Sequence, residues 1–157
     1  MIKIAHRGNF NGPDQSTENS PEQVYKAILA GYNAEVDLWV VDQKLYFGHD
    51  KPTYLVDPYF IHQNVTKLWL HCKNLEALDF TLSMPKYYQS FWHQEDDFAI
   101  TSNNYIWTYP GKLVNNKSIL VCKDIPSKEI LSSNIAGICT PYVGILSLIK
   151  LDNQNVY

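Results

Sequence analysis

The chain has 157 residues, of which 45% are hydrophobic and 13% aromatic. This length suits a single domain over residues 1–157, and this composition excludes a disordered chain. Its 13 basic and 16 acidic residues give a formal net charge of −3 without any run of Lys or Arg, which makes nucleic acid and anionic membranes poor candidates as main partners.

The first two predicted elements are a strand and a helix. The apolar stretch IKIA at residues 2–5 predicts a short strand that ends at His6. After a polar loop, Ser20 offers a helix N-cap and Pro21 suits the first helical position. Apolar residues then recur with a helical period up to Gly31, where we expect the helix to stop.

The next segment predicts a hairpin. The stretch AEVDLWVV is expected to form a strand, DQK a turn, and LYFGHD a returning strand that ends at His49 and Asp50. Successive side chains of a strand point to opposite faces, so Glu35 and Asp37 share one face. Exposure of both carboxylates on an edge strand is the structural alternative.

Shorter elements follow. The stretch KLWLHCKN predicts a strand with His71 and Lys73 on one face, and a helix is expected from Leu75 to Leu82. Further strands are expected in SFWHQ, FAITS, SILVCK and GICTPYV, with a helical turn in SKEILSS and a frayed polar tail after Ile149. This alternation predicts an α/β fold with a largely parallel sheet.

Polar residues recur at the ends of these strands, which gather at one rim of a parallel α/β framework. Paired carboxylates suit a divalent cation, Arg and Lys suit a phosphate, and histidines serve as general acid and base. Together they predict metal-assisted cleavage of a phosphate ester. The residues concerned are His6, Arg7, Glu35, Asp37, His49, His71 and Lys73.

Four short motifs resemble one enzyme family. HRG at 6–8, ENS at 18–20, EVD at 35–37 and HD at 49–50 occur in the order found in the glycerophosphodiester phosphodiesterases. The chain also resembles the wider group of phospholipase-like phosphodiesterases that share the fold. The resemblance covers roughly the first 75 residues and implies a TIM-barrel ancestry with an active site at the rim.

The resemblance also implies roles for individual residues. By motif position, His6 and His49 would form the acid–base pair. Arg7 would bind the phosphate, and Lys73 would stabilise the pentavalent transition state. In such enzymes a neighbouring hydroxyl of the substrate attacks phosphorus and gives a cyclic phosphate.

The metal site implied by the resemblance consists of Glu35 and Asp37, braced by Glu18 and Asn19. Mg²⁺ or Ca²⁺ is the expected ion. The family usually has a third ligand, a glutamate, where this chain has His71. That histidine would shift the preference towards Mn²⁺, Zn²⁺ or Fe²⁺, or else signal weaker metal binding or none.

The length of the chain is a second departure from the family. A complete eight-fold barrel needs about 250 residues. We therefore expect an abridged or incomplete TIM-barrel-like fold that is open or closed by a partner. Open sheets expose unpaired edges, so a homodimer is a physically sensible solution, and a monomeric mass in light scattering would count against it.

Four residues outside the motifs also have expected positions relative to the site. His93, in FWHQ, lies at a predicted strand end and is a candidate substrate contact. Trp107 belongs to an aromatic loop at 103–111 that would stack on a sugar or base, close over the site, or simply cover an abridged barrel. His62 lies in a polar stretch and is expected at the surface. Cys72 alternates away from the site, so no nucleophilic cysteine is expected.

The cysteines and the first residues bear on location. The three cysteines, Cys72, Cys122 and Cys139, are odd in number and lack CxxC spacing, which favours a reducing compartment over a disulfide scaffold or zinc site. The stretch MIKIAHRG is no signal segment, and no apolar run approaches the roughly 20 residues of a membrane span. A cytoplasmic location without stable membrane insertion is expected.

The sequence thus favours a metal-dependent phosphodiesterase acting on a small phosphodiester with a free hydroxyl beside the phosphate, such as a glycerophosphodiester. A glycan-linked or nucleotide-linked phosphodiester is nearly as plausible. Two alternatives stay open: a lyase that stops at the cyclic phosphate, and a phosphate-ligand binding module without turnover. The shorter chain and His71 favour the binding module, whereas the pair His6 and His49 speaks against it.

Overall fold

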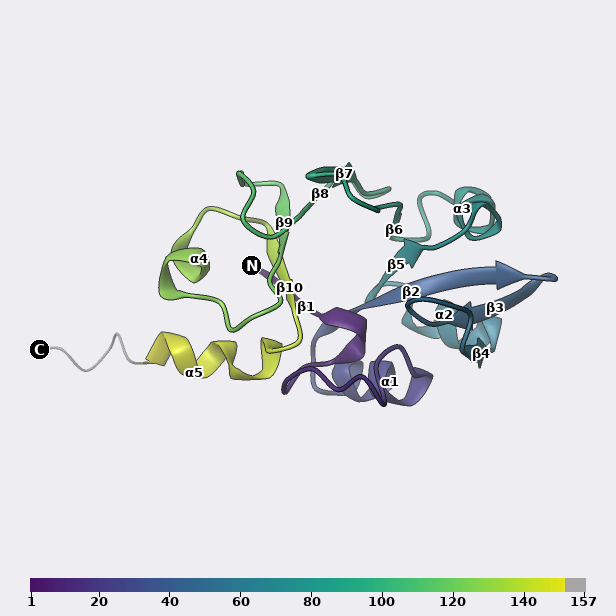
Figure 1. The fold of residues 1–157 in the computed structure, drawn as a ribbon, viewed down its shortest axis with the longest axis horizontal. Coiled ribbons are helices and arrows are strands. Elements are labelled where there is room, and N and C mark those ends of the chain that lie inside the picture. Colours follow the sequence, from purple (N-terminus) through teal and green to yellow (C-terminus); the bar gives the residue numbers. More distant parts are fainter. Residues whose placement is uncertain (152–157) are drawn as a thin grey trace, which may run out of the picture.

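The computed structural model describes residues 1–151 and shows a mixed α/β fold built on one curled sheet (Figure 1). Seven strands form its parallel part, in the spatial order β6-β5-β2-β1-β10-β9-β8. Their bounds are β1 Ile2–Ala5, β2 Asn33–Val41, β5 Leu68–Cys72, β6 Ser90–Phe91, β8 Ile106–Thr108, β9 Ser118–Val121 and β10 Gly137–Thr140.

The order of these strands in space follows their order in the chain, and the last strand, β10, returns to pair with β1. Strands β6 and β8 share no ladder. They are linked through the segment after β7 instead, because the Ser102 N–H donates to the Ser90 carbonyl at 2.8 Å and the Ser90 N–H donates to Ser102 Oγ at 2.8 Å. The curled sheet is therefore compatible with an incomplete barrel.

The expectation of a largely parallel sheet needs correction, because three further strands pair antiparallel with their neighbours. They are β3 Lys44–Phe47, β4 Tyr54–Val56 and β7 Phe98–Ile100. The physical reason lies in β2, which continues past its parallel partner β5 to a two-residue turn. Asp42 and Gln43 both adopt positive φ there and send the chain straight back as β3.

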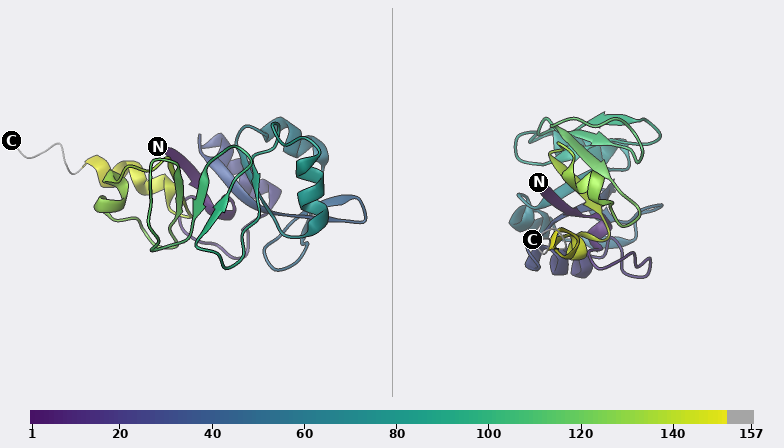
Figure 2. Two further views of the ribbon diagram at one scale, coloured as in Figure 1. Left: turned by 90° about the horizontal axis from the view of Figure 1, so that it is seen from above. Right: turned by 90° about the vertical axis from the view of Figure 1, so that its left-hand side faces the viewer.

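The helices cover only part of the curled sheet. They are α1 Pro21–Leu29, α2 Pro58–Asn64, α3 Leu75–Leu82, α4 Lys128–Ser132 and α5 Leu146–Leu151, with 3₁₀ turns η1 His6–Gly8 and η2 Val143–Ile145. Residues 83–127 contain no helix. Figure 2 shows α4 and α5 at one end of the molecule and α3 at the other. No helix within residues 1–151 is long and apolar enough to cross a membrane.

Local sequence signals explain several of these boundaries. Ser20 Oγ accepts a hydrogen bond from the Gln23 N–H at 3.1 Å, with Pro21 at the first position of α1 as predicted. The helix predicted from Leu75 to Leu82 is confirmed. Its cap is Asn74, which accepts from the Ala77 N–H at 3.1 Å.

The structure differs from expectation at one strand end, in three additional elements and at the end of the last helix. The returning strand of the hairpin ends at Phe47, so His49 lies in the loop that follows. Strand β4, helix α2 and strand β8 were not predicted, and β8 lies inside the stretch at 103–111 that was expected to be a loop. Residues 150 and 151 belong to α5, and the rest of the predicted frayed tail, 152–157, lies outside the described residues.

The two faces of β2 carry side chains of different chemistry and pack in different places. Val36 and Leu38 pack outward into the core beneath the helices, whereas Glu35 and Asp37 point to the inside of the curled sheet and are 2% and 1% exposed. The alternative of solvent-exposed carboxylates is therefore wrong.

Aromatic side chains from facing strands fill the inside of the sheet. The rings of Phe91 and Trp107 stack with centroids 4.2 Å apart, and Trp69 lies 6.2 Å from Trp107. The interior is a packed core except at the rim, where the strands end.

Candidate functional site

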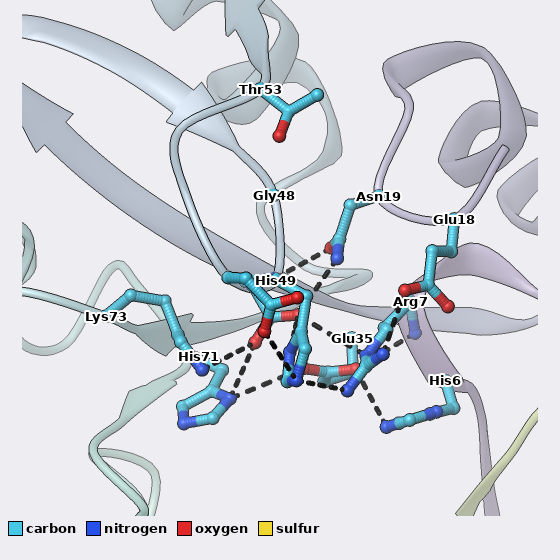
Figure 3. Close-up of polar contacts among 12 residues, drawn as sticks. His6, Arg7, Glu18, Asn19, Glu35, Gly48, His49, Thr53, His71 and Lys73 are labelled. Carbon is cyan, nitrogen blue, oxygen red and sulfur yellow. Dashed lines mark hydrogen bonds and ion pairs between the residues drawn. The ribbon is translucent and has the colours of Figure 1, made fainter. Parts of the chain in front are cut away.

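A cavity of about 310 Å³ opens at the carboxyl ends of the parallel strands. Glu18 and Asn19 stand beside it and reach it through hydrogen bonds to Arg7 and Asp37. The structure thus brings all eleven predicted site residues to one place (Figure 3 shows most of them). Those lining the cavity are His6, Arg7, Glu35, Asp37, His49, His71, Lys73, His93 and Trp107.

Arg7 is held in a left-handed backbone conformation with φ 52°, in the turn directly after β1. Gly8 follows with φ 77°, where a Cβ would press within 3.0 Å of the Val24 backbone. This turn directs the Arg7 backbone N–H at Glu35 Oε2, 2.9 Å away, and its Nη1 at Glu18 Oε1, also 2.9 Å away. Burial opposes the charge of Arg7, but the surrounding carboxylates outweigh it and raise the pKa of the guanidinium.

Asp37 is the centre of the site, and its two oxygens face different groups. Oδ1 lies 2.9 Å from His71 Nδ1 and 3.5 Å from Lys73 Nζ. Oδ2 accepts from Asn19 Nδ2 at 2.9 Å and lies 3.2 Å from His49 Nδ1. Burial alone would raise the pKa of Asp37, but the hydrogen bonds from both histidines and the positive charges nearby hold that pKa well below its usual value.

Asn19 fixes the position of Asp37 twice. Besides its bond to the side chain, its Oδ1 accepts from the Asp37 backbone N–H at 2.9 Å, so the amide clamps both ends of the residue. Asn19 itself has φ 62° and donates its N–H to the Arg7 carbonyl. Asn19, which the sequence predicts to brace the pair Glu35 and Asp37, therefore makes direct side-chain contacts with Asp37.

The hydrogen-bond partners of His49 indicate which tautomer its neutral ring would adopt. Arg7 Nη2 lies 2.9 Å from His49 Nε2, and a guanidinium can only donate, so Nε2 is the acceptor. The proton of the neutral ring is then on Nδ1 and points at Asp37. Gly48 precedes this histidine at a position where a Cβ would collide with the Lys51 carbonyl oxygen.

His71 has the arrangement found in metal-binding histidines. Its Nε2 donates to the His93 carbonyl oxygen at 2.7 Å, which leaves Nδ1 facing Asp37 Oδ1 at 2.9 Å and Glu35 Oε1 at 3.8 Å. Ligating histidines usually donate their other N–H to such a carbonyl. The ionised Asp37 carboxylate offers only acceptors, so a proton or a cation must lie between its Oδ1 and Nδ1.

The donor set therefore fits a divalent cation. One ligand atom from each of Glu35, Asp37 and His71 lies within 4.8 Å of the other two. The ring of His71 is also stacked on Phe91, with centroids 4.9 Å apart and planes 7° apart, which fixes its orientation.

Burial shifts the proton affinity of two further groups. It raises the pKa of Glu35 to about 7, with the charge of Asp37 adding to the effect. Burial, followed by the charge of Arg7, lowers the pKa of His6 to about 3. His6 Nε2 lies 3.9 Å from Glu35 Oε2, so a neutral histidine stands beside a carboxyl that holds its proton up to neutral pH.

The raised pKa of Glu35 predicts a pH-dependent stability in protein treated with EDTA. Between the ordinary value of 4.5 and about 7, the folded state binds more protons than the unfolded state, so the contribution of Glu35 to stability falls as the pH rises. Glu35→Gln removes this loss. From pH 4.5 to 8, the unfolding free energy of the variant should gain on the order of 3 kcal/mol relative to wild type, measured by urea titration.

If the difference in unfolding free energy between Glu35→Gln and wild type stays constant from pH 4.5 to 8, the prediction is wrong. The comparison cancels any fixed cost of the amide, because such a cost does not vary with pH. Added metal should shrink the effect, since a bound cation favours the ionised carboxylate.

Several residues of the cavity were not predicted. They follow β6, β8 and β9 and form a wall of Trp92, Gln94, Tyr109 and Lys123. Lys123 could have been found, because it stands at the end of the predicted strand SILVCK, as Lys73 does in its own strand. Tyr109 could not, because the aromatic stretch at 103–111 that contains β8 predicts a loop.

The remaining predicted residues have clear positions. Trp107 is 4% exposed and packs among aromatic rings, so it forms the floor of the cavity more than its opening. His93 is 9% exposed. His62 is exposed as expected, and Cys72 is buried with its pKa raised to about 11 by burial, as expected of a thiol in the core.

Comparisons of the chain with models of protein families, with curated proteins and with solved structures find no match. The resemblance to the glycerophosphodiester phosphodiesterases therefore rests on the four motifs of the sequence.

Proposed function

We propose that the protein is a metal-dependent phosphodiesterase that cleaves a small phosphodiester of the glycerophosphodiester kind. The observation that supports the proposal is that the two carboxylate oxygens of Asp37 face different histidines. One oxygen faces the candidate metal ligand His71, and the other faces the candidate acid–base residue His49. A single buried carboxylate thereby joins a metal site to a proton-transfer site.

Glu35, Asp37 and His71 would hold the cation. A donor set of two carboxylates and one imidazole suits Mn²⁺ or Zn²⁺ as well as Mg²⁺, and Ca²⁺ less well. When bound, the cation would neutralise the buried carboxylates and polarise a phosphoryl oxygen of the substrate.

Arg7 and Lys73 would bind the phosphate. Both line the cavity, and both extend their cationic groups towards Asp37. A phosphate oxygen would compete with His49 for the Nη2 donor of Arg7, which frees His49 Nε2 for proton transfer. Substrate binding and preparation of the base would then be one event.

His6 and His49 would supply the acid and the base from opposite sides of Arg7. One would take the proton of a neighbouring substrate hydroxyl as it attacks phosphorus, and the other would protonate the leaving oxygen. The product of this step is a cyclic phosphate, which the enzyme either releases or hydrolyses.

The test is a panel of glycerophosphoglycerol, glycerophosphocholine and bis(p-nitrophenyl) phosphate, assayed with Mg²⁺, Ca²⁺, Mn²⁺, Zn²⁺ or EDTA. We expect turnover that requires metal and is lost in both His6→Ala and Glu35→Ala. Phosphorus NMR of the products distinguishes the cyclic phosphate of a lyase from the phosphomonoester of a hydrolase.

Equal turnover in EDTA and in metal would overturn the metal-dependent mechanism. Absence of turnover, with a melting temperature that metal or inorganic phosphate still raises, would favour a phosphate-binding module. The contact between Arg7 and His49, which occupies the acid–base nitrogen, is the observation in favour of that second function.

A further inference from the structure

One wall of the cavity carries aromatic rings, an amide and a lysine, whereas the opposite side carries the carboxylates Glu35 and Asp37. It is the wall of Trp92, Gln94, Tyr109 and Lys123, which follow β6, β8 and β9. Figure 1 shows these strands on the opposite side of the curled sheet from β1, which precedes His6, and β2, which carries Glu35 and Asp37. A substrate in the cavity would therefore have its phosphate on one side and this wall on the other.

The wall is anchored to the candidate metal site. The ring of Tyr109 stacks on the ring of His93, with centroids 5.8 Å apart and planes 18° apart. His93 Nε2 lies 2.7 Å from the Asp96 carbonyl oxygen, and the carbonyl of His93 accepts from His71. The position of Tyr109 is thus fixed through the residue that also orients a candidate metal ligand.

Lys123 gives the wall its charge. Its Nζ lies 5.6 Å from the centroid of the Tyr109 ring, within the range of a cation–π contact. Among residues 1–151, Arg7 and Lys73 pair with carboxylates of the site, whereas Lys123 forms no ion pair. Within these residues it is a cation at the edge of the cavity without a carboxylate in ion-pair contact.

The balance of charge indicates what this lysine would bind. A phosphodiester carries one negative charge, for which Arg7 and Lys73 are already present. A cationic leaving group such as choline would meet Lys123 with like charge. The cavity of about 310 Å³ is at the small end of ligand sites, so both ends of a compact substrate would be in contact with it.

We infer that Lys123 and Tyr109 form a leaving-group subsite for an anion, so that the preferred substrate is a phosphodiester whose alcohol carries a carboxylate or a second phosphate. The inference rests on the proposed phosphodiesterase function. Lys123 is then a specificity residue, and its loss lowers the preference for the anionic ester over a neutral one.

The test uses a matched pair of esters. Glycerophosphoglycerol is the neutral member, and its analogue with the terminal CH₂OH of the leaving glycerol oxidised to a carboxylate is the anionic member. We expect wild type to show a kcat/KM about tenfold higher for the anionic ester, since a charge-assisted contact has this magnitude. Lys123→Gln should bring the ratio close to one, whereas Lys123→Arg should retain it.

Lys128→Gln is the matched control, because this exposed lysine begins α4 and does not line the cavity. It should leave the ratio at the wild-type value. A third ester with a terminal phosphate in place of the carboxylate separates a general anion site, which accepts both, from one specific for carboxylates. An unchanged ratio in Lys123→Gln would overturn the inference.

A binding measurement separates this inference from the function on which it rests. Calorimetry with the same two esters is carried out on His49→Ala, with and without Lys123→Gln. If no ester is turned over by wild type, the proposed function fails. The anion subsite still stands if the carboxylate ester binds about tenfold more tightly than the neutral one only when Lys123 is present, and it is wrong if the two esters bind equally in both proteins.

Discussion

Asp37→Asn is expected to lower kcat/KM by about a thousandfold or more and to abolish metal binding. The change keeps the shape of the side chain but removes a charge that is 1% exposed and lies close to four basic groups. Loss of the metal would remove several kcal/mol of transition-state stabilisation, and each 1.4 kcal/mol of activation free energy is about tenfold in rate. Steady-state kinetics and a calorimetric metal titration measure the two effects.

Asp79→Asn is the matched control for this substitution. Asp79 is an exposed aspartate on α3 that does not line the cavity, so activity and metal affinity should stay at wild-type values. A melting temperature recorded for both variants shows whether Asp37→Asn remains folded. A folded Asp37→Asn with activity within tenfold of wild type would refute the central role of this carboxylate.

His49→Ala is expected to lower kcat by about 10²–10⁴-fold, the range that general acid–base catalysis contributes. KM should change much less, because Arg7 and Lys73, which would bind the phosphate, remain in place. In the structure His49 is held between Asp37 and Arg7, so its loss would remove the proposed proton-transfer group and also release one donor of Arg7. The measurement is the separation of kcat from KM in steady-state kinetics.

His62→Ala controls for the loss of a histidine elsewhere. Its ring contacts Tyr87 at the surface, outside the cavity, and its removal should leave both constants unchanged. The double variant His6→Ala/His49→Ala should be little worse than either single variant, since groups that act as a unit are not additive. A rise in KM with constant kcat in His49→Ala would assign that residue to binding only.

Much of the first half of the fold could be predicted because its signals are local. Ser20 followed by Pro21 marks the start of α1, and the alternation of β2 separates Glu35 and Asp37 from the apolar face. A local signal for α2 was also present and overlooked: Asp57 caps this helix and Pro58 begins it. The same rule that identified α1 would have found it.

The contacts that organise the site could not be predicted in this way. Asn19 clamps Asp37 only because its backbone adopts a left-handed conformation, which tertiary contacts stabilise and which the motif does not specify. The orientation of His71 depends on the carbonyl of His93, which belongs to a different strand end. The sequence predicts which groups converge, whereas the partner of each nitrogen follows from the packing.

The wall of the cavity illustrates the limit set by short strands. β8 has three residues and lies in an aromatic stretch next to polar turns, so no period was available to identify it. Tyr109 consequently could not be assigned to the same rim as His49, although it follows a strand of the same sheet, whereas Lys123 ends a stretch that the sequence does predict as a strand.

The position of β1 in the sheet has a consequence for the order of folding. β1 pairs with β2 through only two residues, Ile4 and Ala5, but with β10 along its whole length, from Ile2 opposite Gly137 to Ala5 opposite Thr140. Contacts between segments so distant in the chain form late, because closing the intervening loop costs entropy before the ladder stabilises it. During synthesis β1 keeps one edge unpaired until β10 has emerged. His6 and Arg7, which directly follow β1, are therefore among the last of the described residues to be fixed in place.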